Sequence, residues 1–595
     1  MARKSLAPMV AIAALASTSM VASPTLVAAQ SHTQPHVAPD PLVARTSFYL
    51  PMRDGVRLAV NVYRPAKDGK PIAEKAPAVF AFTPYRARYR DDSGKIIDLI
   101  DSNEFGLRNL VHHGYVVATA DIRGKGASFG SRRGFLDQTE ANDGAQIIEW
   151  LAQQPYSDGR VGMTGCSYLG GTAMLVASAR PPALKAVFSA ATDWDKYTFV
   201  RRGGITAQFN TRPDEPATVD LASVPVDADT DGKLLRAAVA QHSDNTPMAG
   251  LWYGMPYRDS VSQYTNNAFW EEVGPYPRKA EMNKPGLAWY LWGNWSDEPT
   301  EQVLRSAANI DNAKLIVGPG LHCVNPDQFD ITAVQKRFFD HYLKGVDNGI
   351  DNEPKYSWWR EDGTGGTLVR SNRLPGADAT TVSLYLDMPG QNGSEGTLDS
   401  MAPSAQRYRF AIDYDLDTES YFSFWPKAPG GHGPAFSTPP LAEAATIEGY
   451  PVISVQASAD AQQANMFAYL EDVDPSGKST VLALGRLAGS HRKLSPPPYD
   501  NLGLPYHSGL KADVSPLPVD QPVTLRFALS PRSYVVGKGH RLRVVLAGAD
   551  PRQRNLAQIK SGLAKSWTLV GGTDGSRIDI PFVTPVRFEK PAQSQ

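Results

Sequence analysis

Short apolar runs alternate with helical patterns in the first half of the chain. A turn at Asp54-Gly55 precedes an alternation of apolar and polar residues up to Pro65, which predicts an opening strand. Continuous apolar runs bounded by turns or polar residues predict buried parallel strands at 78–82, 115–120, 160–164, 184–189, 286–292 and 313–317. Helical spacing before prolines predicts helices over 141–153 and 168–179. This succession predicts an α/β domain with a parallel sheet.

The alternation of strands and helices is interrupted once and then ends. Between 199 and 282 the sequence is charged, Asp-rich and aromatic, with helical candidates such as 234–241, which indicates an inserted helical cap. Beyond residue 374, short β-like segments recur between Gly, Pro, Asp and Asn, at 382–386, 452–455, 523–529 and 542–546. We therefore predict an α/β domain over 45–198 and 283–373, a helical cap over 199–282, and an all-β jelly-roll domain over 374–595.

The amino terminus has the pattern of an export signal. Arg3 and Lys4 precede an uncharged, Ala-rich apolar stretch over 6–29 that ends in Val-Ala-Ala. This predicts a signal peptide over 1–29, cleaved after Ala29, and a linker over 30–44 that contains Pro, His and Gln. A membrane anchor is the alternative, but Pro8 and Pro24 make a poor spanning helix. We expect a periplasmic or secreted protein without a membrane segment after cleavage.

Composition and charge exclude several function classes. The 595 residues include 42% hydrophobic ones, enough for more than one core. Sixty Lys and Arg residues stand against 61 Asp and Glu residues, so no net field attracts nucleic acid or anionic lipid. The sequence lacks the zinc-protease and Cys-x-x-Cys spacings, the Walker loop and the dinucleotide fingerprint, so we expect neither a metal nor a cofactor.

A serine in a glycine-rich turn is the strongest candidate for chemistry. Residues 162–171 (GMTGCSYLGG) join a predicted strand to a predicted helix, with Ser167 at the turn and Gly165 relieving crowding before it. This is the context of a nucleophile elbow, where unpaired N–H groups of the helix face a developing oxyanion. The strict G-x-S-x-G form is not met, since Leu169 holds the last glycine position and Gly170 follows. An ordinary Gly/Ser turn is the alternative.

Two later residues complete a hydrolase triad in the expected chain order of Ser, Asp and His. Asp297 and His322 each follow an apolar run, which places them at the carboxyl ends of parallel strands, where ligands bind in open α/β sheets. His322 would take the proton of Ser167 and return it to the leaving group. Asp297 would fix the imidazole and stabilise its charged form. A histidine in a Gly/Pro loop with no such role is the alternative.

The sequence resembles the cocaine esterase and X-Pro dipeptidyl peptidase family of α/β-hydrolases, which also contains α-amino-acid ester hydrolases. The resemblance extends through nearly the whole mature chain. It rests on residues 52–58 (MRDGVRL), 83–85 (TPY), 120–124 (ADIRG), 165–170 (GCSYLG) and 338–349 (FFDHYLKGVDNG). It implies an α/β-hydrolase domain with a helical cap, followed by a jelly-roll domain, in agreement with the organisation inferred above.

The resemblance also implies an oxyanion hole made of a tyrosine hydroxyl and the backbone N–H after the nucleophile. Tyr85 and Tyr168 hold those positions. Pro84 has no N–H to donate, so a side-chain donor would replace it. A structural role for Tyr85 is the alternative.

The two cysteines of the chain flank the candidate nucleophile and base. Cys166 precedes Ser167 and Cys323 follows His322, so a hydrogen-bonded Ser–His pair would bring them close enough for a disulfide in an exported protein. Locally this is similar to the C-S, D, H-C pattern of tannase and feruloyl esterase enzymes. Two buried, reduced thiols are the alternative.

Substrate preference is less well defined by the sequence. Family members that act on α-amino-acid esters resemble one another in a Ser-Tyr-Glu-Gly elbow and in acidic residues after the triad aspartate. Here Glu298 is the one acidic residue directly after Asp297, which is a weak site for a substrate ammonium group. An ammonium site at Asp193 and Asp195 stays an open alternative. For the remaining candidates a structural role is the alternative. Trp194, Tyr197 and Phe199 could line an acyl pocket or pack in a core. Arg201 and Arg202 could bind a substrate carboxylate or form salt bridges.

These observations predict an exported serine hydrolase that cleaves a small-molecule carboxylic ester through an acyl-enzyme on Ser167. The alternative within the family is an X-Pro or aminoacyl peptidase or a β-lactam acylase, which acts on amides. The alternative from another class is a non-catalytic protein that binds a saccharide or polymer. The sequence leaves a homo-oligomer open.

Overall fold

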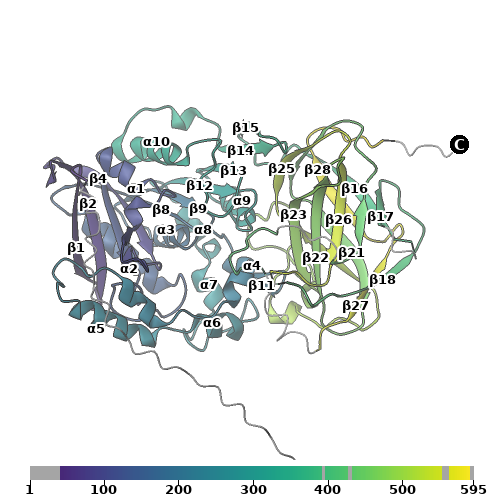
Figure 1. Ribbon diagram of the computed structural model, residues 1–595, viewed down its shortest axis with the longest axis horizontal. Coiled ribbons are helices and arrows are strands. Elements are labelled where there is room, and N and C mark those ends of the chain that lie inside the picture. Colours follow the sequence, from purple (N-terminus) through teal and green to yellow (C-terminus); the bar gives the residue numbers. More distant parts are fainter. Residues whose placement is uncertain (1–39, 391–394, 418, 427–431, 553–561, 590–595) are drawn as a thin grey trace, which may run out of the picture. The chain divides into compact units, whose positions relative to one another are not determined.

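A long, mostly parallel sheet organises the first part of the described chain (Figure 1). The computed structural model describes residues 40–390, 395–417, 419–426, 432–552 and 562–589, and all of these residues except Asp40 belong to one compact unit, Pro41–Gln595. The strand order is β1 (Val43–Pro51), β2 (Arg57–Lys67), β7 (Val116–Asp121), β4 (Ala76–Thr83), β8 (Ser157–Cys166), β9 (Leu184–Ala190), β12 (Ala288–Asn294), β13 (Ala313–Gly318), β14 (Tyr356–Glu361) and β15 (Gly366–Ser371). Pairing is parallel from β7 to β14 and antiparallel at both ends.

Helices cover both faces of this sheet, which explains why its central strands are continuous apolar runs. On one face pack α2 (Gln138–Ala152), α3 (Tyr168–Ser178) and α9 (Thr300–Asn309), and on the other α1 (Leu107–His112) and α10 (Ile331–Lys344). Alternate residues of β4 enter the two cores, with Phe80 and Phe82 on the first face and Val79 and Ala81 on the second.

The predicted strands and helices of this part are confirmed, with shifted boundaries. Helix α2 begins at Gln138 instead of residue 141 because the Asp137 carboxylate accepts hydrogen bonds from the N–H groups of Thr139 and Glu140 and caps the helix there. Strand β1 was not predicted. It lies at the edge of the sheet and most of its residues are half-buried, so its sequence lacks the apolar alternation of a core-facing strand.

Short helices dominate the segment between β9 and β12. They are α4 (Lys196–Val200), α5 (Lys233–Gln241), α6 (Met248–Gly254), α7 (Phe269–Val273) and α8 (Lys279–Met282), with a small hairpin of β10 (Arg201–Arg202) and β11 (Ile205–Thr206). The predicted helix over 234–241 is therefore confirmed. This segment has its own, mainly aromatic core, which includes Trp252, Phe269, Trp270 and Val273.

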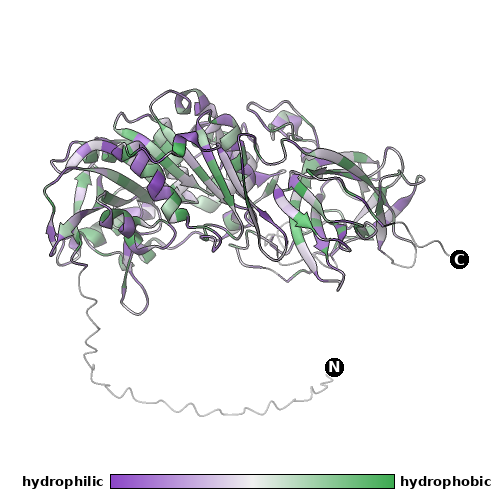
Figure 2. Ribbon diagram, turned by 90° about the horizontal axis from the view of Figure 1, so that it is seen from above, coloured by the Kyte–Doolittle hydropathy of each residue, from purple (hydrophilic) through white to green (hydrophobic). Residues whose placement is uncertain are grey.

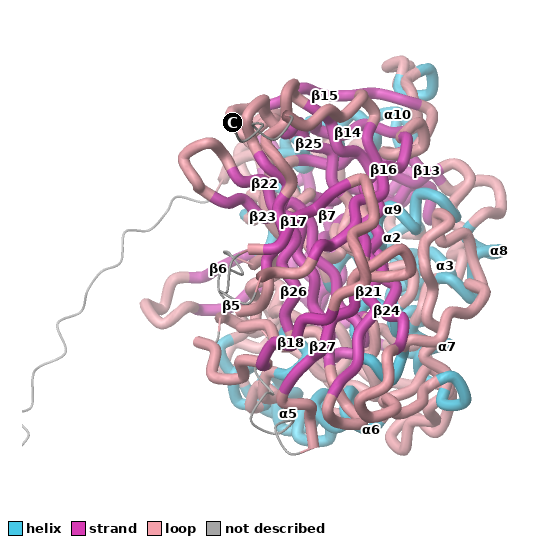
Figure 3. Tube along the Cα trace, turned by 90° about the vertical axis from the view of Figure 1, so that its right-hand side faces the viewer, coloured by secondary structure: helices cyan, strands magenta, loops and turns pink. Residues whose placement is uncertain are grey.

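The last part of the described chain is built of strands with little helix (Figure 3). Its strands are β16 (Thr380–Asp387), β17 (Gly396–Asp399), β18 (Arg407–Ala411), β19 (Ala435–Ser437), β20 (Ala445–Gly449), β21 (Val452–Ala459), β22 (Asn465–Val473), β23 (Ser479–Ala488), β24 (Val523–Ala528), β25 (Arg532–Val536), β26 (Arg541–Ala547), β27 (Ser566–Val570) and β28 (Arg577–Phe582). They pair antiparallel, except for β17 with β19. We call this part the C-terminal β part.

Apolar side chains between these strands form a second large core. Ile447, Val455, Leu470, Trp567 and Ile580 are all buried in it, and Figure 2 shows apolar residues on the strands of both parts. A single parallel pairing of β14 with β25 joins the two parts through their sheets. The β-rich texture predicted beyond residue 374 is confirmed.

Smaller elements complete the described chain: β3 (Lys70–Pro71), β5 (Arg88–Arg90), β6 (Ile96–Asp98) and short 3-10 turns at Leu99–Asp101, Gln208–Thr211, Ala217–Ala222, His242–Asp244, Tyr276–Arg278, Ile350–Asn352, Gly489–His491 and Lys511–Asp513. Among the described residues, none of the helices is both long and apolar enough to cross a membrane. The predicted signal peptide over 1–29 and most of the predicted linker over 30–44 lie outside the described residues.

Candidate active site

Ser167 stands at a sharp turn between β8 and α3. Its backbone has φ 59° and ψ −124°, a conformation that non-glycine residues adopt at a strained turn, and its N–H donates to the Ala190 carbonyl. The turn needs its glycines, because a Cβ at Gly165 would lie 2.4 Å from the Leu169 backbone and one at Gly170 would lie 2.6 Å from the Ala190 oxygen. The displaced glycine of the motif is thus explained by close backbone contact at Gly170.

Asp297 and His322 meet at the carboxyl ends of β12 and β13. The His322 Nδ1 lies 2.9 and 3.0 Å from the two carboxylate oxygens of Asp297, which is almost fully buried. Burial lowers the pKa of His322, but the Asp297 carboxylate outweighs this effect, and with Glu104 it raises the pKa above its usual value. An imidazole held at Nδ1 in this way leaves Nε2 to exchange a proton with a substrate or a nucleophile.

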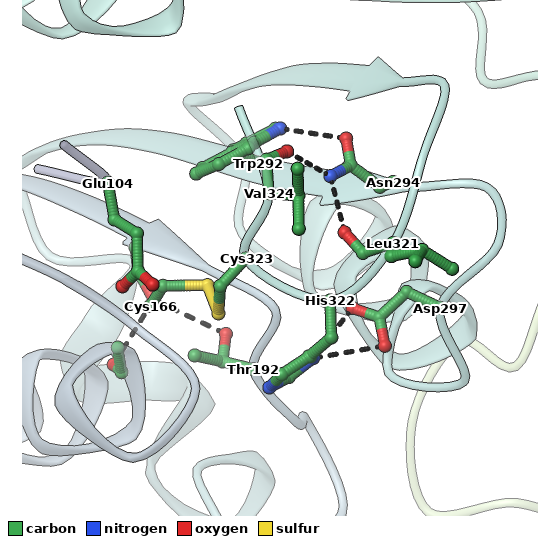
Figure 4. Close-up of a disulfide and its surroundings, with 12 residues drawn as sticks. Glu104, Cys166, Thr192, Trp292, Asn294, Asp297, Leu321, His322, Cys323 and Val324 are labelled. Carbon is green, nitrogen blue, oxygen red and sulfur yellow. Dashed lines mark hydrogen bonds and ion pairs between the residues drawn. A yellow bond between two sulfur atoms is a disulfide. The ribbon is translucent and has the colours of Figure 1, made fainter. Parts of the chain in front are cut away.

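A disulfide joins the Ser167 turn to the His322 loop (Figure 4). It links Cys166, the last residue of β8, to Cys323, with a Cα–Cα distance of 5.9 Å, so the pairing proposed from the sequence is present in the structure. Asn294 holds the same loop from the other side, because its Nδ2 donates to the carbonyls of Leu321 and Val324. Cys323 itself has a positive φ of 55°. The loop that carries His322 is therefore fixed on both flanks.

Ser167 and His322 line one cavity of about 490 Å³. The two side chains are not hydrogen-bonded to each other in this structure, although such bonds are often longer before a substrate is bound. The cavity extends away from Ser167 between the sheet and the segment that connects β9 to β12, which contributes Asn210, Arg212 and Trp252 to its wall. This volume suits a small-molecule substrate.

The two predicted oxyanion residues occupy different positions around Ser167. Tyr85 lines the same cavity as Ser167, with an exposed side chain. The Asp121 carboxylate holds the Tyr85 loop, because it accepts the N–H of Ala87 at 2.6 Å. The Tyr168 hydroxyl points elsewhere and donates to buried Glu140, so only its backbone N–H, at the first position of α3, is left as a donor for the site.

The predicted acyl pocket is only partly correct. Phe199 lines the cavity, but Trp194 and Tyr197 do not. Trp194 is fully buried in the core beneath the sheet, and Tyr197 packs edge-on against Trp270 in the aromatic core of the inserted segment. The reason is that Trp194 precedes the cap residue of α4 and packs into the core, and that successive side chains within α4 point in different directions.

Three carboxylates that could bind a substrate ammonium group are already paired. Asp193 lies 2.7 Å from the Lys196 ammonium, and both side chains are buried. Asp195 is bound by Arg258 at 2.7 Å and caps α4. Glu298 is enclosed by arginines. None of these acids presents an uncompensated negative charge to the cavity.

Glu298, the neighbour of Asp297, is the centre of a buried ion cluster. Its carboxylate is bound by Arg202 at 2.9 Å, by Arg486 at 3.4 Å and by Arg552. Burial raises the pKa of Glu298, but the three guanidinium groups outweigh it and bring the pKa to about 2. Because Arg486 and Arg552 belong to the C-terminal β part, this part contacts the residue next to Asp297, the candidate aspartate of the triad.

Two aromatic residues of the site were missed by sequence reasoning. Phe424 lies over the His322 ring, with ring centroids 4.2 Å apart, and Phe422 lines the cavity beside it. Both come from the loop between β18 and β19, about a hundred residues after His322. No local pattern links that loop to the triad, so only the tertiary structure reveals them. Phe209, from the inserted segment, extends the same aromatic wall.

Fold and site together define a serine hydrolase of the α/β class. Residues 54–324 match the model of the X-Pro dipeptidyl-peptidase (S15 family), and residues 348–557 match that of the X-Pro dipeptidyl-peptidase C-terminal non-catalytic domain. The chain belongs to the family that contains these peptidases and cocaine esterase. The family resemblance inferred from the sequence is thereby confirmed.

Individual relatives agree with this assignment over 75% to 91% of the chain. A Mycobacterium bovis protein named "Putative serine esterase" is 29% identical over 91% of this chain and 95% of its own length. The cocaine esterase of a Rhodococcus species is 25% identical over 75% of this chain and 83% of its own. The structure of a CocE/NonD family hydrolase from Staphylococcus aureus, 20% identical, has a TM-score of 0.66 and covers 90% of this chain and 93% of that one.

The disulfide predicts a measurable gain in stability. Replacing both Cys166 and Cys323 with alanine opens a cross-link between residues 157 positions apart, and the loss of this constraint should lower the free energy of unfolding by about 2–4 kcal/mol. The measurement is the urea midpoint of the variant and of the wild type, with and without a reductant. Reduced wild type should match the variant, and equal midpoints for variant and oxidised wild type would show that the disulfide is not formed.

The buried ion cluster predicts a strong effect of Glu298→Gln. The neutral amide leaves three buried arginines without their common carboxylate, which should lower the free energy of unfolding by about 3–5 kcal/mol. Glu281→Gln, which breaks an exposed pair with Lys284, is the matched control and should change it by less than about 1 kcal/mol. Urea unfolding of both variants provides the comparison. A Glu298→Gln midpoint equal to that of the control would contradict the role of the cluster.

Proposed function

We propose that the protein is an exported serine hydrolase that cleaves carboxylic esters of small molecules through an acyl-enzyme on Ser167. The observation that carries the proposal is His322, which is paired with Asp297 and lines one cavity with Ser167 at its strained turn. In this proposal Asp297, His322 and Ser167 form the catalytic triad. The relatives named serine esterase and cocaine esterase support ester chemistry.

The proposed reaction has two half-steps. His322 Nε2 takes the hydroxyl proton of Ser167 while Oγ bonds to the ester carbonyl carbon, and the tetrahedral intermediate then expels the alcohol, which receives that proton. Water adds to the acyl-enzyme with His322 again as base, and the acid leaves as Ser167 regains its proton. Asp297 stabilises the imidazolium in both half-steps and remains ionised.

The developing oxyanion would be bound by two donors. These are the backbone N–H of Tyr168, the first residue of α3, and the hydroxyl of Tyr85, whose loop is held by Asp121. The segment over 199–282 would act as a helical cap, because its residues form the cavity wall opposite Ser167. The C-terminal β part would be a jelly roll, in keeping with its antiparallel pairing.

Ester hydrolysis is favoured over cleavage of aminoacyl or X-Pro substrates by the charges around the site. A free amino terminus needs a carboxylate without other partners, whereas Asp193 is paired with Lys196 and Asp195 with Arg258. Asp214, which also lines the cavity, accepts hydrogen bonds from the backbone N–H groups of Met248 and Ala249. Glu298 is held by arginines and is not among the residues that line the cavity. Amide cleavage remains the alternative that the relatives named Xaa-Pro dipeptidyl-peptidase suggest.

Export to the periplasm or the cell exterior belongs to the proposal. The Arg3-Lys4 start and the apolar stretch over 6–29 support a cleaved signal peptide, and the Cys166–Cys323 disulfide suits an oxidising compartment. We propose no nucleic-acid or membrane partner for the mature chain, and self-association stays open to measurement. A protein that only binds saccharides or polymers is disfavoured by the preserved Ser167, Asp297 and His322.

Ser167→Ala tests the proposed nucleophile. Loss of Oγ should reduce ester turnover on the order of 10⁴-fold or more, because the triad residues act as a unit. The measurement is hydrolysis of aryl esters of simple and aromatic acids, an aminoacyl ester, an X-Pro amide and a glutaryl amide. Ser178→Ala, at the far end of the helix that begins after Ser167 and outside the cavity lining, is the control and should retain activity.

Labelling separates an inactive binding protein from an enzyme with an unusual substrate. A serine-directed phosphonate should label wild type once per chain and leave Ser167→Ala unlabelled. Turnover that survives in Ser167→Ala would overturn the proposed mechanism. Absence of labelling in the wild type would instead favour the binding protein.

The raised pKa of His322 predicts the pH dependence of activity. The base must be neutral, so kcat/KM should rise with pH through the His322 pKa and then level off. Asp297→Asn removes the charge that raises this pKa, so the acid limb should move to lower pH while the rate falls. Glu104→Gln should cause a smaller shift in the same direction. An acid limb that stays at the wild-type pH in both variants would contradict the assignment of His322 as the base.

A further inference from the structure

A second, much smaller cavity lies where the chain from β1 to β15, which we call the catalytic part, meets the C-terminal β part. Its volume is about 70 Å³. Four arginines line it, namely Arg201, Arg202 and Arg305 of the catalytic part and Arg486 of β23, whereas Glu301 is the one carboxylate among its described lining residues. The sequence had singled out Arg201 and Arg202, but the active-site cavity includes neither.

The charges around this cavity do not balance. Glu301 lies 3.3 Å from Arg305 and 3.5 Å from Arg202. Glu298 is bound by Arg202, Arg486 and Arg552. Arg552 also binds Asp550. The guanidinium of Arg201 donates to the Trp252 carbonyl, and the described residues place no carboxylate in an ion pair with it.

Five arginines therefore face three carboxylates in this buried region: Arg201, Arg202, Arg305, Arg486 and Arg552 against Glu298, Glu301 and Asp550. Burial lowers the pKa of Arg201, the guanidinium without a carboxylate partner. An excess of buried positive charge is costly unless an anion compensates it.

Several donors of the lining residues lack a hydrogen-bond partner. They are the Nε atoms of Arg201 and Arg486, and the Nε of Arg202 has only the Glu301 carboxylate, 3.5 Å away; the ring atom Nε2 of His491 also has no hydrogen-bond partner. Arg202 is 7% and Arg486 3% exposed, so water at the molecular surface does not satisfy them. Burial lowers the pKa of His491 to about 4, with contributions from His507 and Arg201, so this ring adds no charge at neutral pH.

We propose that this cavity binds a tetrahedral inorganic oxyanion, phosphate or sulfate. Planar guanidinium groups match the oxygen pairs of such ions better than they match a halide. One molecule of liquid water occupies about 30 Å³. The cavity therefore has room for an oxyanion or a few water molecules, but not for an organic acid of substrate size.

The anion site and the active site lie on opposite sides of one short helix. Lys196 and Phe199 of α4 line the active-site cavity, while Tyr197 and Thr198 line the small one. A bound oxyanion would connect Arg201 of the catalytic part with Arg486 of the β part. It would therefore stabilise the contact between the two parts and should raise the unfolding temperature.

Thermal unfolding of the full mature chain tests the proposal. The protein is equilibrated in buffer free of phosphate, sulfate and chloride, with gluconate holding the ionic strength constant, and sodium phosphate or sodium sulfate is added at millimolar concentration. The wild type should show a saturable rise of several degrees. Arg201→Gln, which removes the cation without a carboxylate partner, should abolish the rise and fold without added anion. Arg180→Gln, an exposed arginine bound only to backbone carbonyls, is the matched control and should keep the rise.

Each outcome decides the proposal. A saturable rise that Arg201→Gln removes supports it, and an anomalous selenate peak between Arg201 and Arg486 in crystals of the protein would locate the ion. A rise that is linear in salt and equal in both variants is general salt stabilisation and overturns it. A saturable rise with chloride but not with phosphate or sulfate overturns the choice of an oxyanion, and no rise with any salt shows that water alone fills the cavity.

Discussion

Burial of the Glu298 carboxylate is the constraint on which the arrangement of the two parts depends. A charge without access to water must be compensated by partners, and the catalytic part supplies only Arg202 for it. Arg486 of β23 and Arg552, which follows β26, supply the rest. Because Glu298 follows Asp297 directly, the loop that carries the proposed triad aspartate has its lowest energy only when the β part is docked. A domain described as non-catalytic in the family thus has a physical connection to the site.

The proposed triad is held by backbone features more than by contacts between its own side chains. Parallel strands β8, β12 and β13 end at one edge of the sheet and bring Ser167, Asp297 and His322 together. The Cys166–Cys323 disulfide then fixes the distance between the nucleophile turn and the histidine loop. Since Ser167 and His322 are not hydrogen-bonded before a substrate arrives, this framework supplies the preorganisation that a direct bond would otherwise give.

Features set by local sequence could be predicted, and features set by distant contacts could not. The core strands are apolar because both faces are covered, so they appear as runs such as 78–82, and the Ser167 turn is marked by the two glycines that its close packing requires. Strand β1 lacks such a signal because it lies at an edge. The pocket assignment failed for Tyr197 because the direction of each side chain of α4 depends on the packing of the inserted segment, and it failed for Trp194 because this residue packs into the core of the sheet.

Helix α4 connects the observations that the sequence could not reveal. It has a single turn and a half of backbone, yet it separates the aromatic wall of the active site from an arginine-rich cavity at the contact of the two parts. Asp195 caps it, and Arg258 and Tyr499 hold that cap from the inserted segment and the β part. A change in the docking of the β part therefore acts on α4 at its cap and on Asp297 through Glu298. Both routes end at the same cavity, so the β part influences the shape of the substrate site from two sides without contributing a residue to the proposed triad.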